Sequence, residues 1–214
     1  MTIPTSGKRT LGILISGRGS NMLALADAIS SGQIPNAEIG VVISDQPDAR
    51  GLALAHELGL TTSTITRSGR TREQHEAQIM AKLQEHQVEL VCLAGYMRIL
   101  STQFITAYAG RILNIHPSLL PAFPGLAAQR QALDHGVKWS GCTVHFVDET
   151  LDGGPIVLQS VVPVLDDDTE ESLSARILEQ EHKLYAEAVA LITSGNYEVV
   201  GRRVLRKNQP SKSS

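Results

Sequence analysis

Cysteine is scarce in this sequence, and it has no hydrophobic run long enough to cross a membrane. The two cysteines, Cys92 and Cys142, each lie within an apolar stretch, and neither belongs to a CxxC pair. A disulfide framework and a cysteine metal site are therefore excluded, and we expect two core thiols of a reducing compartment. The first apolar stretch, Leu11 to Ile15, is too short for a signal-peptide core and ends in a glycine loop. Together these absences predict a cytoplasmic protein with no membrane partner.

An excess of charge of one sign is also lacking. Lysine and arginine number 19 against 22 aspartates and glutamates, which leaves a net charge of -3. So small a charge gives the chain no overall electrostatic reason to bind nucleic acid, so the expected partners are small molecules. With 214 residues, 42% of them hydrophobic, the chain can bury one sizeable core. Neither repeats nor low-complexity segments occur, and a homodimer is left open.

Strand-type and helix-type segments alternate over most of the chain. The expected strands are residues 11–15, 39–43, 61–66, 90–94 and 112–116, and the expected helices are residues 22–31, 49–58, 71–86, 101–108 and 129–135. This alternation is typical of a parallel sheet with helices on both faces. Two further strands, 140–147 and 155–164, are joined by a connection too short for a crossover helix. We therefore predict an α/β fold, a Rossmann-like, mostly parallel sheet with an antiparallel C-terminal extension.

The last predicted helix carries an unexpected carboxylate. It is expected to begin at Asp168, with Glu171 completing a capping box. One apolar stripe follows at helical spacing, formed by Leu173, Ile177, Leu184, Tyr185, Ala188 and Ile192. Glu181 lies on the same stripe, where a carboxylate is costly unless it has a partner. It either binds a hydroxyl or amino group of a substrate or lies at the edge of the stripe and reaches solvent.

An amide and an imidazole stand at the end of the predicted strand 112–116. Side chains alternate along a strand, so Asn114 and His116 share one face, and Pro117 ends the ladder. In open parallel sheets, ligands bind at the carboxyl ends of the strands. Three prolines and a glycine then stiffen the connection 117–125. The pair is either part of a site or a histidine and an asparagine that satisfy each other.

A glycine loop, residues 17–21, separates the first strand from the first helix. This order aims backbone N–H groups at an anion. Met22 stands where the third glycine of a dinucleotide fingerprint would fall, and the Gly-Lys-Ser/Thr of a P-loop is missing. A mononucleotide phosphate on Gly19, Ser20 and Asn21 therefore fits better than a pyrophosphate, with a tight turn that binds nothing as the alternative.

Asp152 precedes two glycines and a proline, so its backbone is expected in a tight bend. It either hydrogen-bonds its own turn or orients His116 and stabilises the charged imidazole. Asn114 could then donate to a developing oxyanion. No Gly-x-Ser-x-Gly nucleophile elbow and no metal-ligand spacing are present. The pattern favours acyl transfer, without a metal, onto a nucleophile that the substrate brings.

The remaining histidines have less informative surroundings. Four lie on predicted helices among charged neighbours and are expected at the surface: His56, His75, His86 and His135. His145 lies in a predicted strand two residues after Thr143. We expect it to be a core histidine.

Five stretches of the chain together resemble the phosphoribosylglycinamide formyltransferases, a folate-dependent family of purine biosynthesis. They are Ser16–Asn21, Leu93–Leu100, Asn114–Pro121, Val144–Val147 and Leu151–Ile156. They follow the family's order and spacing. The resemblance implies that a formyl group passes from 10-formyltetrahydrofolate to the amine of glycinamide ribonucleotide, with no metal.

The resemblance also implies a role for individual residues. The catalytic trio would be Asn114, His116 and Asp152. The phosphate would lie on Gly19, Ser20 and Asn21, and Glu181 would hold the nucleotide. The folate pocket would be lined by Met97, Arg98, Ile99, Leu100, Asp148, Glu149 and Asp152, largely through backbone groups. Three residues depart from the family's pattern: Arg18 stands where asparagine is frequent, and Ala127 and Gln129 replace residues that are histidine in some relatives.

The resemblance implies one domain, residues 1–205, with a nucleotide-binding half at about 8–108 and a catalytic, folate-binding half at about 109–205. Residues 1–7 and the tail 206–214 are expected to be disordered. Formyltetrahydrofolate deformylase has the same trio but passes the formyl group to water, and it usually carries an extra N-terminal domain. Methionyl-tRNA formyltransferase is related but needs a further C-terminal domain and a basic surface. A nucleotide-binding module without catalysis would leave the trio without a shared purpose.

Overall fold

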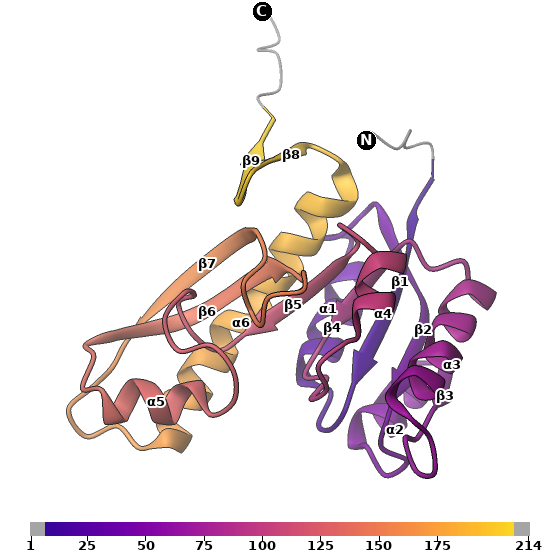
Figure 1. Ribbon diagram of the computed structural model, residues 1–214. Coiled ribbons are helices and arrows are strands. Elements are labelled where there is room, and N and C mark those ends of the chain that lie inside the picture. The colour runs from indigo at the N-terminus through magenta and orange to yellow at the C-terminus, as the bar shows by residue number, and fades with distance from the viewer. Residues whose placement is uncertain (1–6, 208–214) are drawn as a thin grey trace, which may run out of the picture.

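A computed structural model describes residues 7–207, in which nine strands form a single sheet (Figure 1). The spatial order is β3-β2-β1-β4-β5-β6-β7-β9-β8. The parallel part contains β1 (Arg9–Ile15), β2 (Ala37–Ser44), β3 (Thr62–Thr64), β4 (Leu90–Leu93) and β5 (Ile112–His116). β6 (Trp139–Phe146) and β7 (Ile156–Pro163) extend it antiparallel, so the predicted fold class is confirmed.

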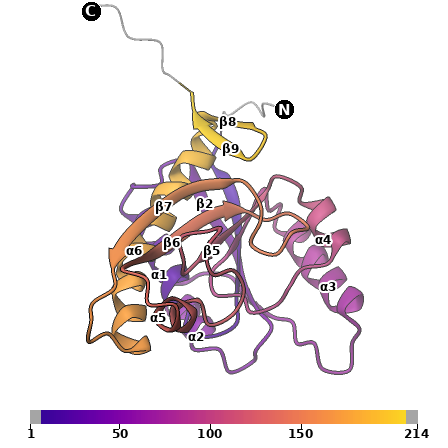
Figure 2. The same cartoon turned by 60° about the vertical axis from the view of Figure 1, so that its left-hand side comes forward.

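The helices cover both faces of this sheet (Figures 1 and 2). On one face α6 (Glu170–Ser194) packs against α1 (Ser20–Ser30) and α5 (Ala128–Asp134), and α2 (Arg50–Glu57) packs against α1. On the other face α3 (Arg72–Glu85) packs against α4 (Thr102–Ala107). None of these helices combines the length and apolar content that a membrane span needs, as far as residues 7–207 are concerned.

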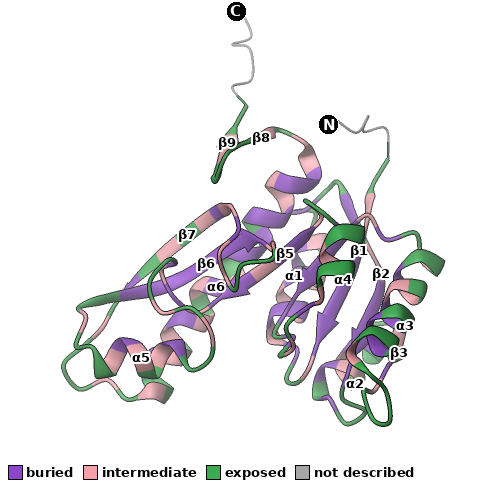
Figure 3. Ribbon diagram, viewed as in Figure 1, coloured by how far each residue is buried: buried purple, intermediate pink, exposed green. Residues whose placement is uncertain are grey.

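Two hydrophobic cores, one on each face of the sheet, follow directly from the strand sequences. In β1, Leu11, Ile13 and Ile15 enter the core beneath α1 and α6, whereas Leu14 enters the core beneath α3 and α4. Because both faces are covered, the central strands are apolar along most of their length, and Figure 3 shows them mostly buried. Both cysteines are buried, as predicted, and burial raises the pKa of the Cys92 thiol to about 12.

Two details of the helices differ from the prediction. The N-cap of α6 is Thr169, which forms its capping box with Ser172, while Asp168 lies outside the helix and binds Arg176. The predicted box of Asp168 and Glu171 is therefore wrong by one residue. His75 is buried and its Nε2 lies 2.7 Å from the carbonyl oxygen of Ile65, so the predicted surface position is also wrong.

The last two strands of the described residues form a hairpin that the sequence analysis missed. β8 (Tyr197–Val200) and β9 (Arg203–Arg206) pair antiparallel, and β9 joins the sheet through one residue pair with β7. Arg206 belongs to β9 and its Nη2 lies 2.7 Å from Oε1 of Glu187, so the prediction that the tail includes residue 206 is wrong for that residue. The remainder of that tail, residues 208–214, and the N-terminal residues 1–6 lie outside the described residues.

The strand order creates a crevice at the carboxyl ends of the central strands β1 and β4. From β1 the chain moves outward to β2 and β3, and then returns to β4 on the other side of β1. The loops that follow β1 and β4 therefore leave in opposite directions. A crevice opens between such loops at the carboxyl ends of the strands, which is where doubly wound sheets bind ligands.

Candidate active site

A cleft of about 1450 Å³ lies at these strand ends. Every site residue predicted from the sequence lines it: Gly19, Ser20, Asn21, Met97, Arg98, Ile99, Leu100, Asn114, His116, Asp148, Glu149, Asp152 and Glu181. The structure thus brings together segments from the first and last helices and from three strand ends. The cleft has three regions: the glycine loop with Glu181, the Asn114–His116 strand end, and a wall formed by residues 97–100 and 148–152.

The strand end places the amide and the imidazole side by side in the cleft. β5 delivers Asn114 and His116 on the same face, as its alternation predicts. β6 runs antiparallel beside it and sets His145 opposite Asn114, and Thr143 opposite His116. Four polar side chains from two strands therefore meet at one point of the sheet.

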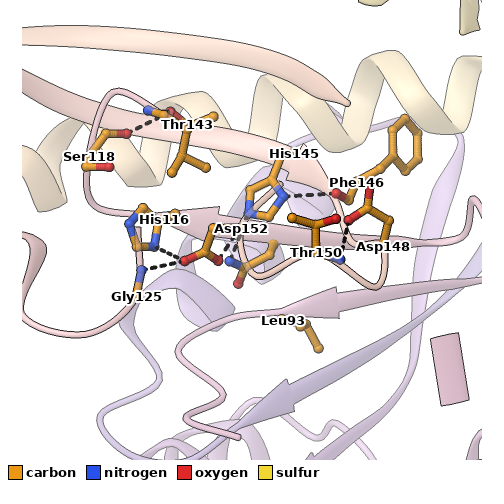
Figure 4. Close-up of polar contacts among 12 residues, drawn as sticks. Leu93, His116, Ser118, Gly125, Thr143, His145, Phe146, Asp148, Thr150 and Asp152 are labelled. Atoms are coloured by element: carbon orange, nitrogen blue, oxygen red, sulfur yellow. Dashed lines mark hydrogen bonds and ion pairs between the residues drawn. The ribbon is translucent and has the colours of Figure 1, made fainter. Parts of the chain in front are cut away.

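His116 is held at both ring nitrogens, and Figure 4 shows the contact with Asp152. Its Nε2 donates to the carbonyl oxygen of Phe123 over 2.9 Å, and its Nδ1 lies 3.5 Å from Oδ2 of Asp152. Because a carbonyl oxygen can only accept, Nε2 carries a proton. Nδ1 is therefore the nitrogen that can exchange a proton with Asp152 or with a reacting group.

Asp152 reaches this position from a strained bend. Its backbone has φ of 49°, in the left-handed region that few residues other than glycine adopt. The bend packs tightly, since a Cβ on Gly154 would lie 1.9 Å from the carbonyl oxygen of Phe146. The backbone N–H of Gly125 donates to Oδ2 of Asp152 over 2.8 Å. The turn therefore directs the Asp152 carboxylate toward His116. Its hydrogen-bond donor is Gly125, in another loop, so the alternative that Asp152 hydrogen-bonds its own turn does not agree with these contacts.

His145 is a site residue that the sequence analysis left in the core. It is buried, as predicted, but its Nε2 lies 3.2 Å from Nδ2 of Asn114 and 3.7 Å from Oδ1 of Asp152. Its Nδ1 donates to the carbonyl oxygen of Phe146 over 2.9 Å, so in the neutral ring Nε2 is the acceptor. Burial lowers the pKa of His145, which favours this neutral form. A neutral His145 thus accepts one N–H of Asn114 and leaves the other N–H for a ligand.

The loop after Pro117 is fixed by a second set of hydrogen bonds. Oγ1 of Thr143 donates to the carbonyl oxygen of Ser118 over 2.7 Å and accepts from the N–H of Leu120 over 3.0 Å. Nε2 of Gln159 contacts both Oγ1 of Thr143 and the carbonyl oxygen of Leu120. These contacts hold the loop whose Phe123 carbonyl binds His116.

The glycine loop ends at the first turn of α1. Gly19 is the N-cap and has φ of 76°, and a Cβ there would lie 2.6 Å from Cα of Gly51. A side chain at this position is therefore excluded both by conformation and by space. No side chain caps the helix, so the first backbone N–H groups of α1 face the cleft. This is the arrangement that binds a phosphate at a helix N-terminus.

Glu181 is buried on α6 and bound to the first turn of α1. Nδ2 of Asn21 donates to Oε2 of Glu181 over 2.8 Å, and both residues are only 7% exposed. Burial raises the pKa of the Glu181 carboxyl, while the bond from Asn21 and the charge of Arg18 oppose that rise. The alternative position, at the stripe's edge with the carboxylate in solvent, is wrong. Arg18 is exposed and adds a positive charge at the same end of the cleft.

We expect Glu181→Gln to weaken nucleotide binding about tenfold or more, since a hydrogen bond to a charged group contributes ~1.5–3 kcal/mol. The same change should not lower thermal stability. Burial raises the pKa of Glu181 above its ordinary value, so the charge of the carboxylate opposes folding at high pH, and this opposition disappears once the carboxyl is protonated in both the folded and the unfolded state. Melting temperatures should therefore show Glu181→Gln more stable than wild type at pH 8 and equal to it near pH 4. Unchanged nucleotide affinity in calorimetry would contradict the binding role.

The third region of the cleft is a partly apolar wall. Met97 and Ile99 are 67% and 69% exposed, and Leu126 and Leu151 are also largely exposed beside the same cleft. Across from residues 97–100, Oδ1 of Asp148 accepts the N–H of Thr150 over 2.9 Å and shapes the loop 148–152 (Figure 4). Exposed apolar side chains that line a cleft are typical of a binding site for a partly apolar small molecule.

Two of the residues that depart from the pattern of the resembled family, Ala127 and Gln129, line the cleft. Ala127 is the N-cap of α5 with φ of 54°. Within residues 7–207, no group of three or more histidine, cysteine, aspartate or glutamate side chains is placed to hold a metal ion.

The side chains in the cleft are suited to two chemical tasks, proton transfer and stabilisation of an oxyanion. His116 and Asp152 can move a proton, and Asn114 can donate to a developing negative oxygen. No serine or cysteine side chain lies within hydrogen-bond reach of His116 among the described residues, so the geometry favours a nucleophile that comes with a substrate.

Comparison with known proteins agrees with this geometry. The profile of the family described as formyl transferase matches residues 9–189. The chain is 42% identical to the phosphoribosylglycinamide formyltransferase of Escherichia coli over 188 residues, 87% of this chain and 88% of that protein. It is 45% identical to the trifunctional purine biosynthetic protein adenosine-3 of Drosophila melanogaster, of which it spans 14%. Its fold matches the crystal structure of glycinamide ribonucleotide transformylase 1 from Symbiobacterium toebii with a TM-score of 0.93 and 48% identity, covering 95% of this chain and 96% of that one.

Proposed function

Because this chain belongs to the formyl transferase family, we propose that it transfers a formyl group from 10-formyltetrahydrofolate to the amine of 5'-phosphoribosylglycinamide, in de novo purine biosynthesis. One observation carries the proposal. Asn114, His116 and Asp152 converge in a cleft that is also lined by the N-terminus of α1, which has no side-chain cap, and by a partly apolar wall. Each half of the cleft suits one of the two substrates.

In the proposed reaction the substrate amine attacks the formyl carbon and a C–N bond forms. Negative charge builds on the formyl oxygen, where the free N–H of Asn114 donates. The amine loses a proton, which His116 and Asp152 accept or relay. The bond from the formyl carbon to N10 of the folate then breaks and N10 takes up a proton. The products are N-formylglycinamide ribonucleotide and tetrahydrofolate, and the proposal assigns no step to a metal.

The first test measures the loss of 10-formyltetrahydrofolate with and without glycinamide ribonucleotide. We expect consumption only when the nucleotide is present, with one tetrahydrofolate formed for each formylated product. Equal consumption without the nucleotide would instead identify a deformylase that uses water. No consumption in either case would favour a binding module without catalysis.

A second prediction concerns the glycine loop. We expect Ser20→Ala and Asn21→Ala to raise the KM for the nucleotide severalfold, because one lies at the free helix end and the other holds Glu181. The KM for the folate should change much less, since the wall 97–100 does not contain these residues. Steady-state kinetics with each substrate varied in turn would check this. Equal changes in both KM values would contradict the assignment of the phosphate to this loop.

A further inference from the structure

The folate wall, residues 97–100, is fastened to the rest of the protein at three points, two of which lie outside the cleft. At its start, Oγ of Ser16 accepts the N–H of Met97 over 3.0 Å, and the N–H of Ser16 donates to the carbonyl oxygen of Gly95 over 3.1 Å. These bonds join the wall to the end of β1. The other two points are made by buried carboxylates that do not line the cleft themselves.

Asp45 is the first of these carboxylates. It follows the last residue of β2, and its side chain is only 2% exposed. Its Oδ2 accepts from Nε of Arg98 over 2.5 Å and from Nε2 of Gln46 over 3.1 Å. Arg98 lines the cleft and its side chain is partly exposed. Asp45 does not line the cleft, so it binds a cleft residue from the protein interior.

Glu76 is the second carboxylate and lies on α3. It is buried, and it accepts the backbone N–H of Ser101 over 2.9 Å and the hydroxyl of the same residue. Ser101 follows the wall directly and is the N-cap of α4, where its Oγ accepts from the N–H of Phe104. Arg72, one helical turn before Glu76, balances its charge over 3.3 Å. The end of the wall is thereby tied to α3.

Burying two carboxylates is costly, and an apolar pair of similar volume often stabilises a protein as well or better. What ion pairs and charged hydrogen bonds supply in addition is fixed geometry. A wall that binds a ligand largely through backbone groups depends on such fixed geometry, because each freely moving segment must be ordered when the ligand binds.

We propose that Asp45 and Glu76 are positioning residues that hold residues 97–100 in the conformation that receives the folate. The inference rests on the proposed function of the cleft. It predicts that loss of either carboxylate weakens folate binding selectively. The partners of the two carboxylates are Gln46, Arg98, Arg72 and Ser101. None of them belongs to the glycine loop or contacts Glu181 through a hydrogen bond, so nucleotide binding should be spared.

The test uses the full chain and tetrahydrofolate, the proposed product, in calorimetry under reducing conditions. We expect Asp45→Asn to weaken tetrahydrofolate binding about three- to tenfold, the usual effect of releasing one or two ordered side chains. The KM for the nucleotide should stay within about twofold. The matched control is Asp48→Asn, which removes the same charge three residues later from an exposed side chain and should change neither value.

A second variant and a double mutant make the outcome decisive. Glu76→Gln should repeat the selective effect, and Asp45→Asn should add little in an Arg98→Ala background, because the anchored side chain is already absent. Tighter folate binding by Asp45→Asn would mean that Asp45 only offsets the charge of Arg98 and would overturn the proposal. Equal losses for both substrates, accompanied by a lower melting temperature, would also overturn it by pointing to a general structural role.

The same experiment separates this inference from the proposed function. Wild-type binding of tetrahydrofolate that neither Asp45→Asn nor Glu76→Gln alters would overturn the inference and leave the proposed function standing. A wild-type chain that does not bind tetrahydrofolate would remove the proposed function, and the inference with it.

Discussion

Replacing His116 by alanine should lower kcat about 10²–10⁴-fold, the usual contribution of a positioned acid–base group. Asp152→Asn should have an effect of similar size. The two side chains act through a single contact, Nδ1 of His116 to Oδ2 of Asp152 at 3.5 Å, while the other nitrogen of His116 is committed to Phe123. Losing either partner therefore disables the same proton path, and the double mutant should be scarcely worse than the poorer single mutant.

The measurement is a double-mutant cycle on kcat, with both KM values followed in parallel. Asparagine is the better replacement at position 152, because it tolerates the left-handed backbone that the turn requires. The controls His56→Ala and Asp134→Asn change the same residue types at exposed positions on α2 and α5. Losses that multiply in the double mutant would show that His116 and Asp152 act independently, and the coupled mechanism would have to be abandoned.

Asn114→Ala should lower kcat about 10²–10³-fold, the usual effect of losing one oxyanion donor. The amide has two N–H groups, and neutral His145 accepts one of them over 3.2 Å. That bond fixes the direction of the second N–H, which faces the cleft. Asn114→Asp should be at least as damaging, because it removes both donors and sets a negative charge where the substrate oxygen becomes negative.

Kinetics of both variants, with melting temperatures, would test this prediction. The KM values should change little, because the oxyanion exists only in the transition state. Asn36→Ala, at an exposed position before β2, serves as the control. A kcat loss below about fivefold would show that Asn114 is not the oxyanion donor, and the bond to His145 would then be its only role.

The features that the sequence predicted well depend on short-range geometry. Alternation along five residues was sufficient to place Asn114 and His116 on one face, and the βα order was sufficient to predict a mostly parallel sheet. The Asp-Gly-Gly bend is also local, and the φ of Asp152 agrees with it. Each of these features is determined by residues that are close to it in the sequence, which is why a single sequence was sufficient to predict it.

The features that were missed depend on pairing between distant segments. His145 faces Asn114 only because β6 runs antiparallel to β5 in one particular register. His75 was assigned to the surface by its charged neighbours, although His75, Ile79 and Leu83 are spaced four apart and form one buried stripe of α3. The β8–β9 hairpin turns at Gly201 and Arg202, but its strands have four residues each, contain charged residues and show no alternation of buried and exposed positions, so no clear strand pattern is visible in the sequence.

The bond between Asn21 and Glu181 joins residues that are 160 positions apart in the chain. During synthesis a ribosome therefore releases the glycine loop long before it releases the carboxylate that completes it. The Asn114–His116 strand end and Asp152 also emerge before α6. The proposed nucleotide site is therefore completed only when α6, the last long helix, docks. The same helix braces the strand end, because Oη of Tyr185 donates to the carbonyl oxygens of Leu93 and Leu113.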